Sequence, residues 1–307
     1  MSCAKYQIKF GAESLCKEDP DRKLSFSLYA PTVARFAVES KHPPHLTETI
    51  ILADRVHAAL VSLSNGSSIF TGCDEQGRPL QGNRHSHVFC ESNIGLGNGT
   101  DGEITHITVY APMGFESENQ SALQDLKEVW SGDDIRVKLL LLGQGLPQDF
   151  GGVDLERGQC PLLTRAKTWI SRTPFLHTHH PKYTRAGVPK VDDTGLQKGS
   201  PEHELLRLLE LAGFPEPETV EPVASTCLGG RDVPWHDFLR RRGERRPAAN
   251  GAGYGFRMEF PEPVQGPVAV GYASHFGMGG FEIETTDGQI SSTYNNDVNK
   301  VNTTCDK

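Results

Sequence analysis

Strand and helix patterns alternate in a fixed order over the first half of this chain, and this order is the strongest constraint on its fold. Strand patterns alternate apolar with polar residues or form short apolar runs, whereas helix patterns place apolar residues three and four apart. The order is β-α-β-β-α-β, with the six segments at residues 23–30, 47–60, 84–90, 104–111, 119–130 and 135–142. It is the ferredoxin-like arrangement, which RNA-recognition (RRM-like) sheets share.

A second, degenerate copy of the same unit follows in the sequence. Its helix has Ser200 as a predicted N-cap and Pro201 as the first helical residue, and it ends before Gly213. Strand patterns lie at residues 167–176, 218–224 and 254–260, and a glycine-rich turn at 271–281 leads into a last strand. We therefore expect an α+β protein of two tandem ferredoxin-like domains, the second ending in a glycine-rich loop. The expected boundaries are a leader at 1–22, domains at 23–145 and 165–290, a linker loop at 146–164 and a disordered tail at 291–307.

Composition argues against several other classes of protein. The chain has 307 residues, enough to bury a core without disulfides or a structural metal. Its apolar runs are too short to span a membrane, and its first residues lack the apolar region of a secretion signal. The 7 cysteines are scattered and form no CxxC pair, which indicates reduced thiols in a cytoplasmic protein.

The charge is unevenly distributed. A net charge of −8 argues against binding polyanions over the whole surface. Residues 163–190, however, contain six basic residues and no acid, and residues 231–246 contain six arginines against three acids. Two basic patches on an acidic body permit local phosphate binding; the alternative is that both are ordinary solvated loops.

Five segments together resemble a known family. They are TGCDEQGRPLQGNRHSHVF, DGEITHITVYAPMGF, AKTWISRTPFLHTHHPK, GYGFRMEF and GPVAVGYASHFGMGGF. Over about residues 47–281 the chain resembles the endoribonuclease half of the fused subunit of type I-U (I-G) CRISPR systems, which belongs to the RAMP superfamily. The backbone half of those fused proteins is missing here, and Asn83 and Cys73 stand where the family has histidine.

This resemblance implies a function and a set of partners. It implies metal-independent cleavage of precursor CRISPR repeat RNA to guide RNA, with no cofactor and no membrane association. Other CRISPR effector subunits, including a separate backbone subunit, are the implied protein partners. The alternative is a non-catalytic RNA-binding structural subunit of the effector complex, which the substitutions at Asn83 and Cys73 keep open.

Histidines are the candidate catalytic residues. RNA cleavage without a metal needs one group to deprotonate the 2′-hydroxyl and another to protonate the leaving 5′ oxygen, and imidazole suits both steps. His85 and His87 share one face of a predicted strand and lead the candidates, with the base and acid roles left open. His57, on a predicted helix, and His106, on the neighbouring strand and expected close to the pair, are reserve candidates. The alternative for each is a hydrogen-bonded structural histidine.

A zinc site is the other interpretation of these residues. Cys73, His85, His87 and Cys90 are ligand types that zinc accepts. Their spacing matches no common zinc module, and His85 and Cys90 would face opposite sides of a regular strand. We expect no metal and free thiols.

The glycine-rich stretch is the first part of the predicted RNA interface. Glycines let backbone amides approach phosphates closely, although the stretch lacks the GK[ST] of a phosphate-binding loop. By resemblance it is the RAMP loop, and the predicted contacts are His275, Gly277, Gly279 and Gly280. The alternative is a tight turn that needs positive φ.

Basic side chains supply the rest of this interface. Arg84 lies beside the candidate catalytic pair, and Lys167, Arg172, Lys182, His177, His179 and His180 are expected to line a groove for the RNA stem. An arginine cluster lies beside Trp235, whose ring is expected to stack on a base; its members are Arg240, Arg241, Arg242, Arg245 and Arg246. The aromatic face of residues 254–260 is expected to be core.

Overall fold

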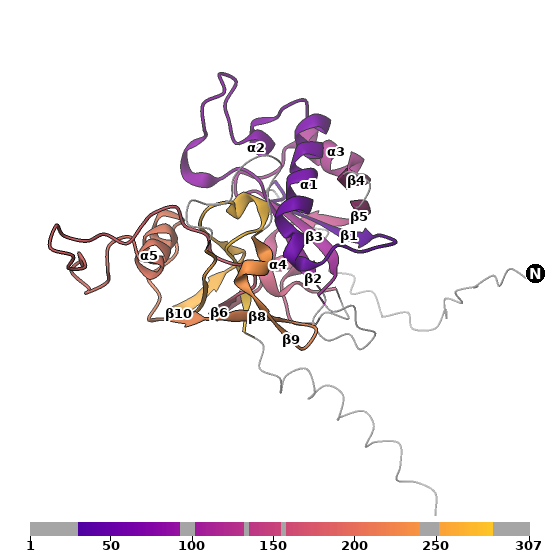
Figure 1. The fold of residues 1–307 in the computed structure, drawn as a ribbon. Helices are drawn as coiled ribbons and strands as arrows, with labels where there is room; N and C mark the ends of the chain where they lie inside the picture. Colours follow the sequence, from indigo (N-terminus) through magenta and orange to yellow (C-terminus); the bar gives the residue numbers. More distant parts are fainter. Residues whose placement is uncertain (1–29, 93–101, 132–134, 155–157, 240–251, 285–307) are drawn as a thin grey trace, which may run out of the picture.

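A computed structural model describes residues 30–92, 102–131, 135–154, 158–239 and 252–284. These residues form a mixed α/β protein with two five-stranded sheets and a two-stranded hairpin, and every pair of neighbouring strands is antiparallel (Figure 1). The expected leader at 1–22, the tail at 291–307 and the arginine cluster at 240–246 lie outside the described residues. None of the described helices is long and apolar enough to cross a membrane.

The first sheet has the strand order β2-β3-β1-β5-β4. Its strands are β1 (Val33–Glu39), β2 (His87–Ser92), β3 (Ile104–Tyr110), β4 (Glu128–Ser131) and β5 (Ile135–Gly145). Its helices are the 3-10 turns η1 (Leu46–Glu48) and η2 (Gln81–Asn83) and the α-helices α1 (Thr49–Leu63), α2 (Ser68–Thr71) and α3 (Ser117–Asp125).

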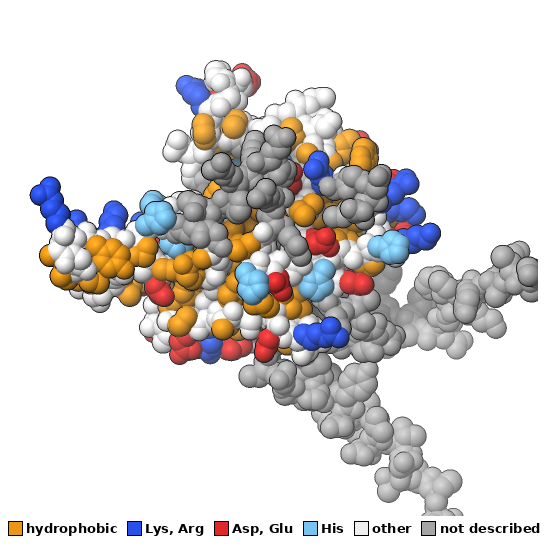
Figure 2. Space-filling view, viewed as in Figure 1, with side chains coloured by type: hydrophobic (Ala, Val, Ile, Leu, Met, Phe, Trp, Pro, Cys, Tyr) orange, Lys and Arg blue, Asp and Glu red, His pale blue; other side chains and the backbone are white. Residues whose placement is uncertain are grey.

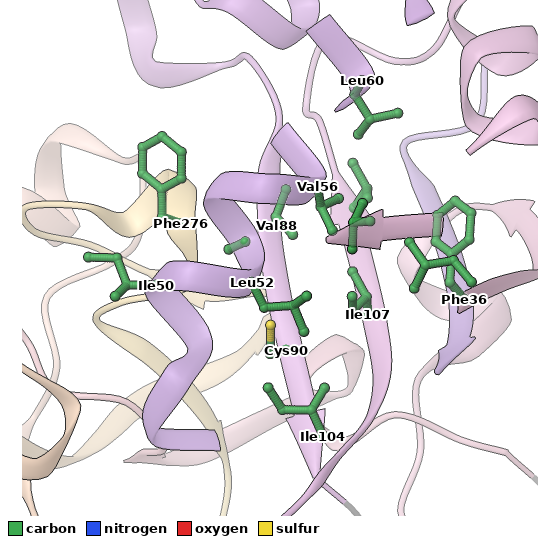
Figure 3. Packing of buried hydrophobic residues seen from close by; sticks show 14 of the residues in the cluster. Phe36, Ile50, Leu52, Val56, Leu60, Val88, Cys90, Ile104, Ile107 and Phe276 are labelled. Atoms are coloured by element: carbon green, nitrogen blue, oxygen red, sulfur yellow. The ribbon is translucent and has the colours of Figure 1, made fainter. Parts of the chain in front are cut away.

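The core of the first sheet lies between the strands and α1. Leu52, Val56 and Leu60 recur at helical spacing on α1 and are fully buried against β2 and β3 (Figure 3). Phe276, from a segment far along the chain, packs into the same core. The second half of the molecule therefore contributes a side chain to the interior of the first.

The second sheet has the strand order β11-β12-β6-β10-β7. Its strands are β6 (Arg165–Ser171), β7 (Thr219–Val223), β10 (Gly255–Gln265), β11 (Val268–Ala269) and β12 (Gly280–Ile283), and β8 (Ser225–Leu228) and β9 (Arg231–Pro234) form the separate hairpin. The remaining helical elements are α4 (Pro147–Phe150), α5 (Pro201–Leu211), η3 (Pro161–Leu163), η4 (Trp235–Phe238) and η5 (Ser274–Phe276). Numbered in chain order within each sheet, both sheets have the same order, 2-3-1-5-4.

Several predicted elements are present with altered limits. α5 begins at Pro201, and the Ser200 side chain accepts a hydrogen bond from the His203 amide as a helix cap. The helix predicted over 119–130 ends at Asp125, and its last residues form β4 instead. The strand predicted at 23–30 lies outside the described residues except for Ala30, which is in no strand; the first described strand is β1.

The two sheets meet across a face that carries buried charge. The guanidinium of Arg35 on β1 pairs with Glu91 on β2 at 2.7 Å, and Arg35 also donates to the Gly158 carbonyl. Burial opposes ionisation of Glu91, but the charge and hydrogen bonds of Arg35 hold the pKa of this carboxyl below its usual value. These contacts tie the linker to the first sheet and fix the edge strand β2, which leads to the candidate site.

Candidate active site

Three histidine rings converge at the start of β2. The ring of His275, in η5, stacks on the ring of His85 with centroids 3.6 Å apart and lies 3.9 Å from the ring of His87. His85 and His87 are 6.2 Å apart and face the same ring, as expected for residues two apart in an extended segment. We call His85, His87 and His275 the histidine cluster.

Packing around η5 brings His275 to this position. Phe276 is buried in the core of the first sheet, and its ring meets the ring of His57 on α1 at 5.1 Å. Gly277 follows with φ of +75°, and a Cβ there would lie 2.7 Å from the Thr49 side chain and 2.8 Å from the Val88 carbonyl. Only glycine allows this close approach, so η5 is held against both α1 and β2.

Hydrogen bonds fix the proton positions on His275. Its Nδ1 lies 3.0 Å from the Ser86 carbonyl oxygen, which can only accept, so Nδ1 carries the proton. Nε2 faces the side-chain oxygen Oδ1 of Asn83, which also only accepts, so in the neutral ring this contact is a hydrogen bond only when the Asn83 amide is turned over to present its nitrogen. Both ring nitrogens of His275 are thus occupied, which suits a positioning residue better than a proton carrier.

The cluster is neutral near pH 7. Burial, followed by the nearby charges of His85 and His57, lowers the pKa of His275 to about 3. Burial and the other two rings lower the pKa of His87 well below its usual value, and burial and His57 lower that of His85. The shared cause is that a second positive charge cannot be placed cheaply among stacked, desolvated imidazoles.

His85 and His87 differ in what their nitrogens meet. His87 is 5% exposed, and its Nδ1 lies 3.1 Å from the His85 carbonyl, so this nitrogen donates and Nε2 keeps its lone pair. His85 is only half-buried, and its buried Nδ1 has no hydrogen-bond partner among the described residues. Its ring lies against Gly72, where a Cβ would come within 2.7 Å of Nε2. His85 therefore has the less committed ring.

The remaining predicted histidines lie in different places. His57 is half-buried on α1 and close enough to lower the pKa of both His85 and His275. His106 is paired in register with Glu91, whereas His87 is paired with Tyr110 at the other end of the same two strands. The expectation that His106 lies close to His85 and His87 is therefore wrong.

The glycine-rich loop differs from its expected role as a phosphate cradle. The amide of Gly277 donates to the Ser274 carbonyl, that of Gly279 to the Pro174 carbonyl at 2.8 Å, and that of Gly280 to the Thr173 hydroxyl at 2.9 Å. All three amides are therefore committed within the protein, and the three glycines are buried. The loop acts as a tight turn that carries His275.

The predicted basic interface is also divided. Arg84 is exposed beside the histidine cluster, and Lys167 and Lys182 are exposed on the second half. Arg172 is not a surface contact: its guanidinium lies 3.5 Å from Glu282, hydrogen-bonds Ser92 and the Cys227 carbonyl, and is 11% exposed. Trp235 is 6% exposed and donates to the Val223 carbonyl, so it cannot stack on a base as expected. His177 is likewise buried.

The structure does not bring the candidate zinc ligands Cys90 and His87 together. The Cys90 thiol is buried in the core beneath α1, 4.0 Å from the Thr49 carbonyl, whereas His87 faces η5. Among the residues that the structure describes, no three His, Cys, Asp or Glu side chains form a group able to hold a metal ion.

Sequence reasoning gave two residues of the site no role in it, although it singled out Asn83 as a position where the family has histidine. Asn83 has φ of +51° and meets His275, and Phe276 anchors the turn that carries this histidine. Asn83 had a visible signal, because it stands within the run Gly82-Asn-Arg-His-Ser-His87 and asparagine tolerates positive φ. Phe276 had none, since an aromatic residue in a glycine-rich stretch does not reveal which core it enters.

Comparison with known proteins found distant matches among solved structures and no match to a sequence family. No family model and no curated protein matches the chain. One similar solved structure is "An RAMP protein binding different RNA substrates", at 10% identity and TM-score 0.42, over 84% of this chain and 100% of that one. Others are "CRISPR associated protein Cas6" (11%, 0.38, 83% and 99%) and "Characterization of a Cas6-related gene from Pyrococcus furiosus" (10%, 0.36, 83% and 98%). Function is therefore inferred from this chain's own residues.

Proposed function

We propose that this chain binds CRISPR repeat RNA and cleaves it as a metal-independent endoribonuclease, with the histidine cluster as its active site. The observation that supports this most is the convergence of His85, His87 and His275. His275 comes from a distant part of the chain, 189 residues after Ser86, and burial keeps all three rings neutral. A neutral imidazole is the form that accepts a proton.

The reaction needs no group beyond those present. One imidazole of the His85 and His87 pair takes the proton of the RNA 2′-hydroxyl, and the 2′ oxygen attacks the adjacent phosphorus. The bond from phosphorus to the 5′ oxygen breaks, and the imidazolium formed in the first step gives its proton to that oxygen. The products are a 2′,3′-cyclic phosphate and a 5′-hydroxyl. Arg84, exposed beside the cluster, neutralises the charge that builds on the phosphate.

The wider setting of this activity is part of the same proposal. The two sheets with a common strand order are two tandem ferredoxin-like domains at 23–145 and 165–290, working in the cytoplasm. The chain acts with other CRISPR effector subunits, a separate backbone subunit among them, and needs no cofactor. These statements rest on the sequence resemblance to the CRISPR endoribonuclease family and on the shared strand order of the two sheets.

The test is cleavage of an end-labelled cognate repeat RNA in the presence of EDTA. We expect a single cut in the wild type and a loss of about 10²- to 10⁴-fold in rate for His85→Ala or His87→Ala, the range of general acid–base catalysis. His42→Ala, which removes an exposed histidine from the first half, is the matched control and keeps the wild-type rate. Activity that disappears in EDTA and returns with zinc contradicts the mechanism.

A non-catalytic RNA-binding subunit is the second candidate function. The burial of His87 and the occupied nitrogens of His275 favour it, because these two rings are poorly placed to meet a substrate. Under this alternative the wild type binds the repeat RNA tightly but does not cleave it, and the RNA in the His85→Ala reaction stays at full length, as it does with the wild type.

A further inference from the structure

Residues 178–199 form an arm that projects from the second half between β6 and α5 (Figure 1). Its sequence repeats every eight residues: Lys-Tyr-Thr-Arg-Ala-Gly-Val-Pro begins at Lys182, Lys-Val-Asp-Asp-Thr-Gly-Leu-Gln begins at Lys190, and a third lysine follows at Lys198. Each octad has lysine first and glycine sixth. Nearly all its residues are exposed, so a packed core does not order the arm.

Local hydrogen bonds order each octad in the same way. In the first, the Thr184 amide donates to the Val188 carbonyl, and the Thr184 hydroxyl accepts from the Val188 amide. In the second, the Asp192 amide donates to the Leu196 carbonyl, and the Asp192 carboxylate accepts from the Leu196 amide. A side chain that caps its own turn makes each octad a closed, rigid unit.

The three lysines meet through their backbones. The Lys190 amide donates to the Lys182 carbonyl at 2.9 Å, the Lys198 amide to the Lys190 carbonyl at 2.8 Å, and the Lys182 amide to the Lys198 carbonyl at 2.8 Å. The bonds close a triangle, which brings the three α-carbons to roughly 5 Å from one another, the spacing of hydrogen-bonded strand residues. We call Lys182, Lys190 and Lys198 the lysine node.

The charge of the lysine node is available to a ligand. All three side chains are exposed, and none forms an ion pair within the part of the chain that the structure describes. Arg185 adds a fourth positive charge, and Figure 2 shows Lys and Arg side chains at the outer end of the arm. The arm has two acids, of which Asp192 caps its own turn and faces His203.

We propose that the lysine node binds backbone phosphates of RNA at a site separate from the histidine cluster. Naming RNA as the ligand rests on the proposed function, whereas the node itself rests only on the backbone triangle and its unpaired charges. Three ammonium groups on flexible stems act as point charges that suit successive phosphates and read no sequence. Because the chain carries −8 overall, a polyanion is expected to bind where positive charge is concentrated.

The test is the salt dependence of RNA binding by the full chain. The probe is a fluorescent stem-loop RNA, and the dissociation constant is measured from about 50 to 200 mM KCl in a His85→Ala background, which prevents cutting. Replacing all three lysines of the node by alanine is expected to reduce the slope of log Kd against log salt by about 2–3 and to weaken binding about tenfold or more at low salt. The matched control removes three exposed lysines of the first half, with the substitutions Lys41→Ala, Lys127→Ala and Lys138→Ala.

Each outcome assigns a cause. An unchanged slope in the node variant, or an equal change in the control, overturns the proposal and leaves an acidic protein surface as the alternative ligand. A node-dependent slope in a protein that never cuts RNA retains the node and rejects the endoribonuclease. Cleavage by the wild type, together with a slope that the node variant leaves unchanged, retains the endoribonuclease and rejects the node. A full chain that binds no RNA at any salt overturns both.

Discussion

The two sheets share one strand order but use their faces differently. Each buries one face: the first sheet packs against α1, and the second packs against α5 through Trp169 and Met258. The opposite face of the first sheet is covered at β1 and β2, where the Arg35–Glu91 pair has side chains only 4% and 13% exposed, but it is open at β5, where Leu140 is 66% exposed. The second sheet likewise has a buried charge at β12, where Glu282 is 18% exposed beside Arg172, whereas Arg257 on β10 and its partner Glu284 are 29% and 34% exposed.

This difference shows that the halves of the molecule are not equivalent in role. The first sheet provides β2, which begins at His87 and directly follows His85, and the part of its second face around Val33 and Phe89 is covered by the other half. The second sheet supplies the turn with His275 and the projecting arm. The same strand order therefore has two uses: the first half positions His85 and His87, and the second half positions His275 against them.

The sharpest way to break this comparison is to remove one arginine from each sheet. Arg35→Ala leaves Glu91 buried without its partner and is expected to lower the free energy of unfolding by about 3–5 kcal/mol. Arg257→Ala breaks an ion pair that water screens and is expected to cost at most about 1 kcal/mol. Urea denaturation of both variants measures the two losses. Equal losses contradict the assignment of a buried and an exposed face.

A smaller effect is expected at the turn that joins the halves. Gly277→Ala places a methyl group against Thr49 and the Val88 carbonyl in a left-handed conformation, and it is expected to cost about 2–4 kcal/mol. Gly66→Ala is the matched control, because Gly66 has φ of +80° but no atom within 4 Å of an added Cβ, so about 1 kcal/mol is expected. Thermal or urea unfolding reports both. If the two losses agree, the close packing of the turn is not what stabilises it.

The last expected effect, the smallest when taken per pH unit, is on the pH dependence of stability. An unfolded histidine binds a proton near pH 6.5, whereas folded His275 binds one only at about 3, so the unfolded chain binds more protons between these values. The free energy of unfolding therefore falls as pH is lowered through this window. His275→Gln removes this contribution and is expected to reduce the slope by up to about 1.4 kcal/mol per pH unit. Identical slopes for variant and wild type argue against the low pKa of His275.

The sequence predicted the elements better than their limits. The Ser200 cap was readable because serine followed by proline marks a helix start. β1 was missed because Val33, Ala34 and Phe36 are all fully buried, so no alternation marks the strand. Trp130 was assigned to a helix by its spacing, although it is 67% exposed on β4, a short strand that pairing with β5 defines.

The site was predictable only where it is local. The common direction of His85 and His87 follows from their spacing, but the arrival of His275 depends on how η5 packs on α1 and β2. Arg172 is a residue for which a purely local interpretation was wrong. Its sequence neighbourhood is basic and free of acids, and nothing in it indicates a partner as distant as Glu282.

The separation of 189 residues between Ser86 and His275 also sets the order in which the molecule is assembled during synthesis. All strands of the first sheet leave the ribosome well before η5, and at about 5–20 residues per second the delay is on the order of ten seconds. During that interval the chain contains His85 and His87 but not the turn η5 with His275 that packs on them. A nascent or truncated chain that ends before η5 therefore lacks the third ring, and the site is completed only after η5 has been synthesised.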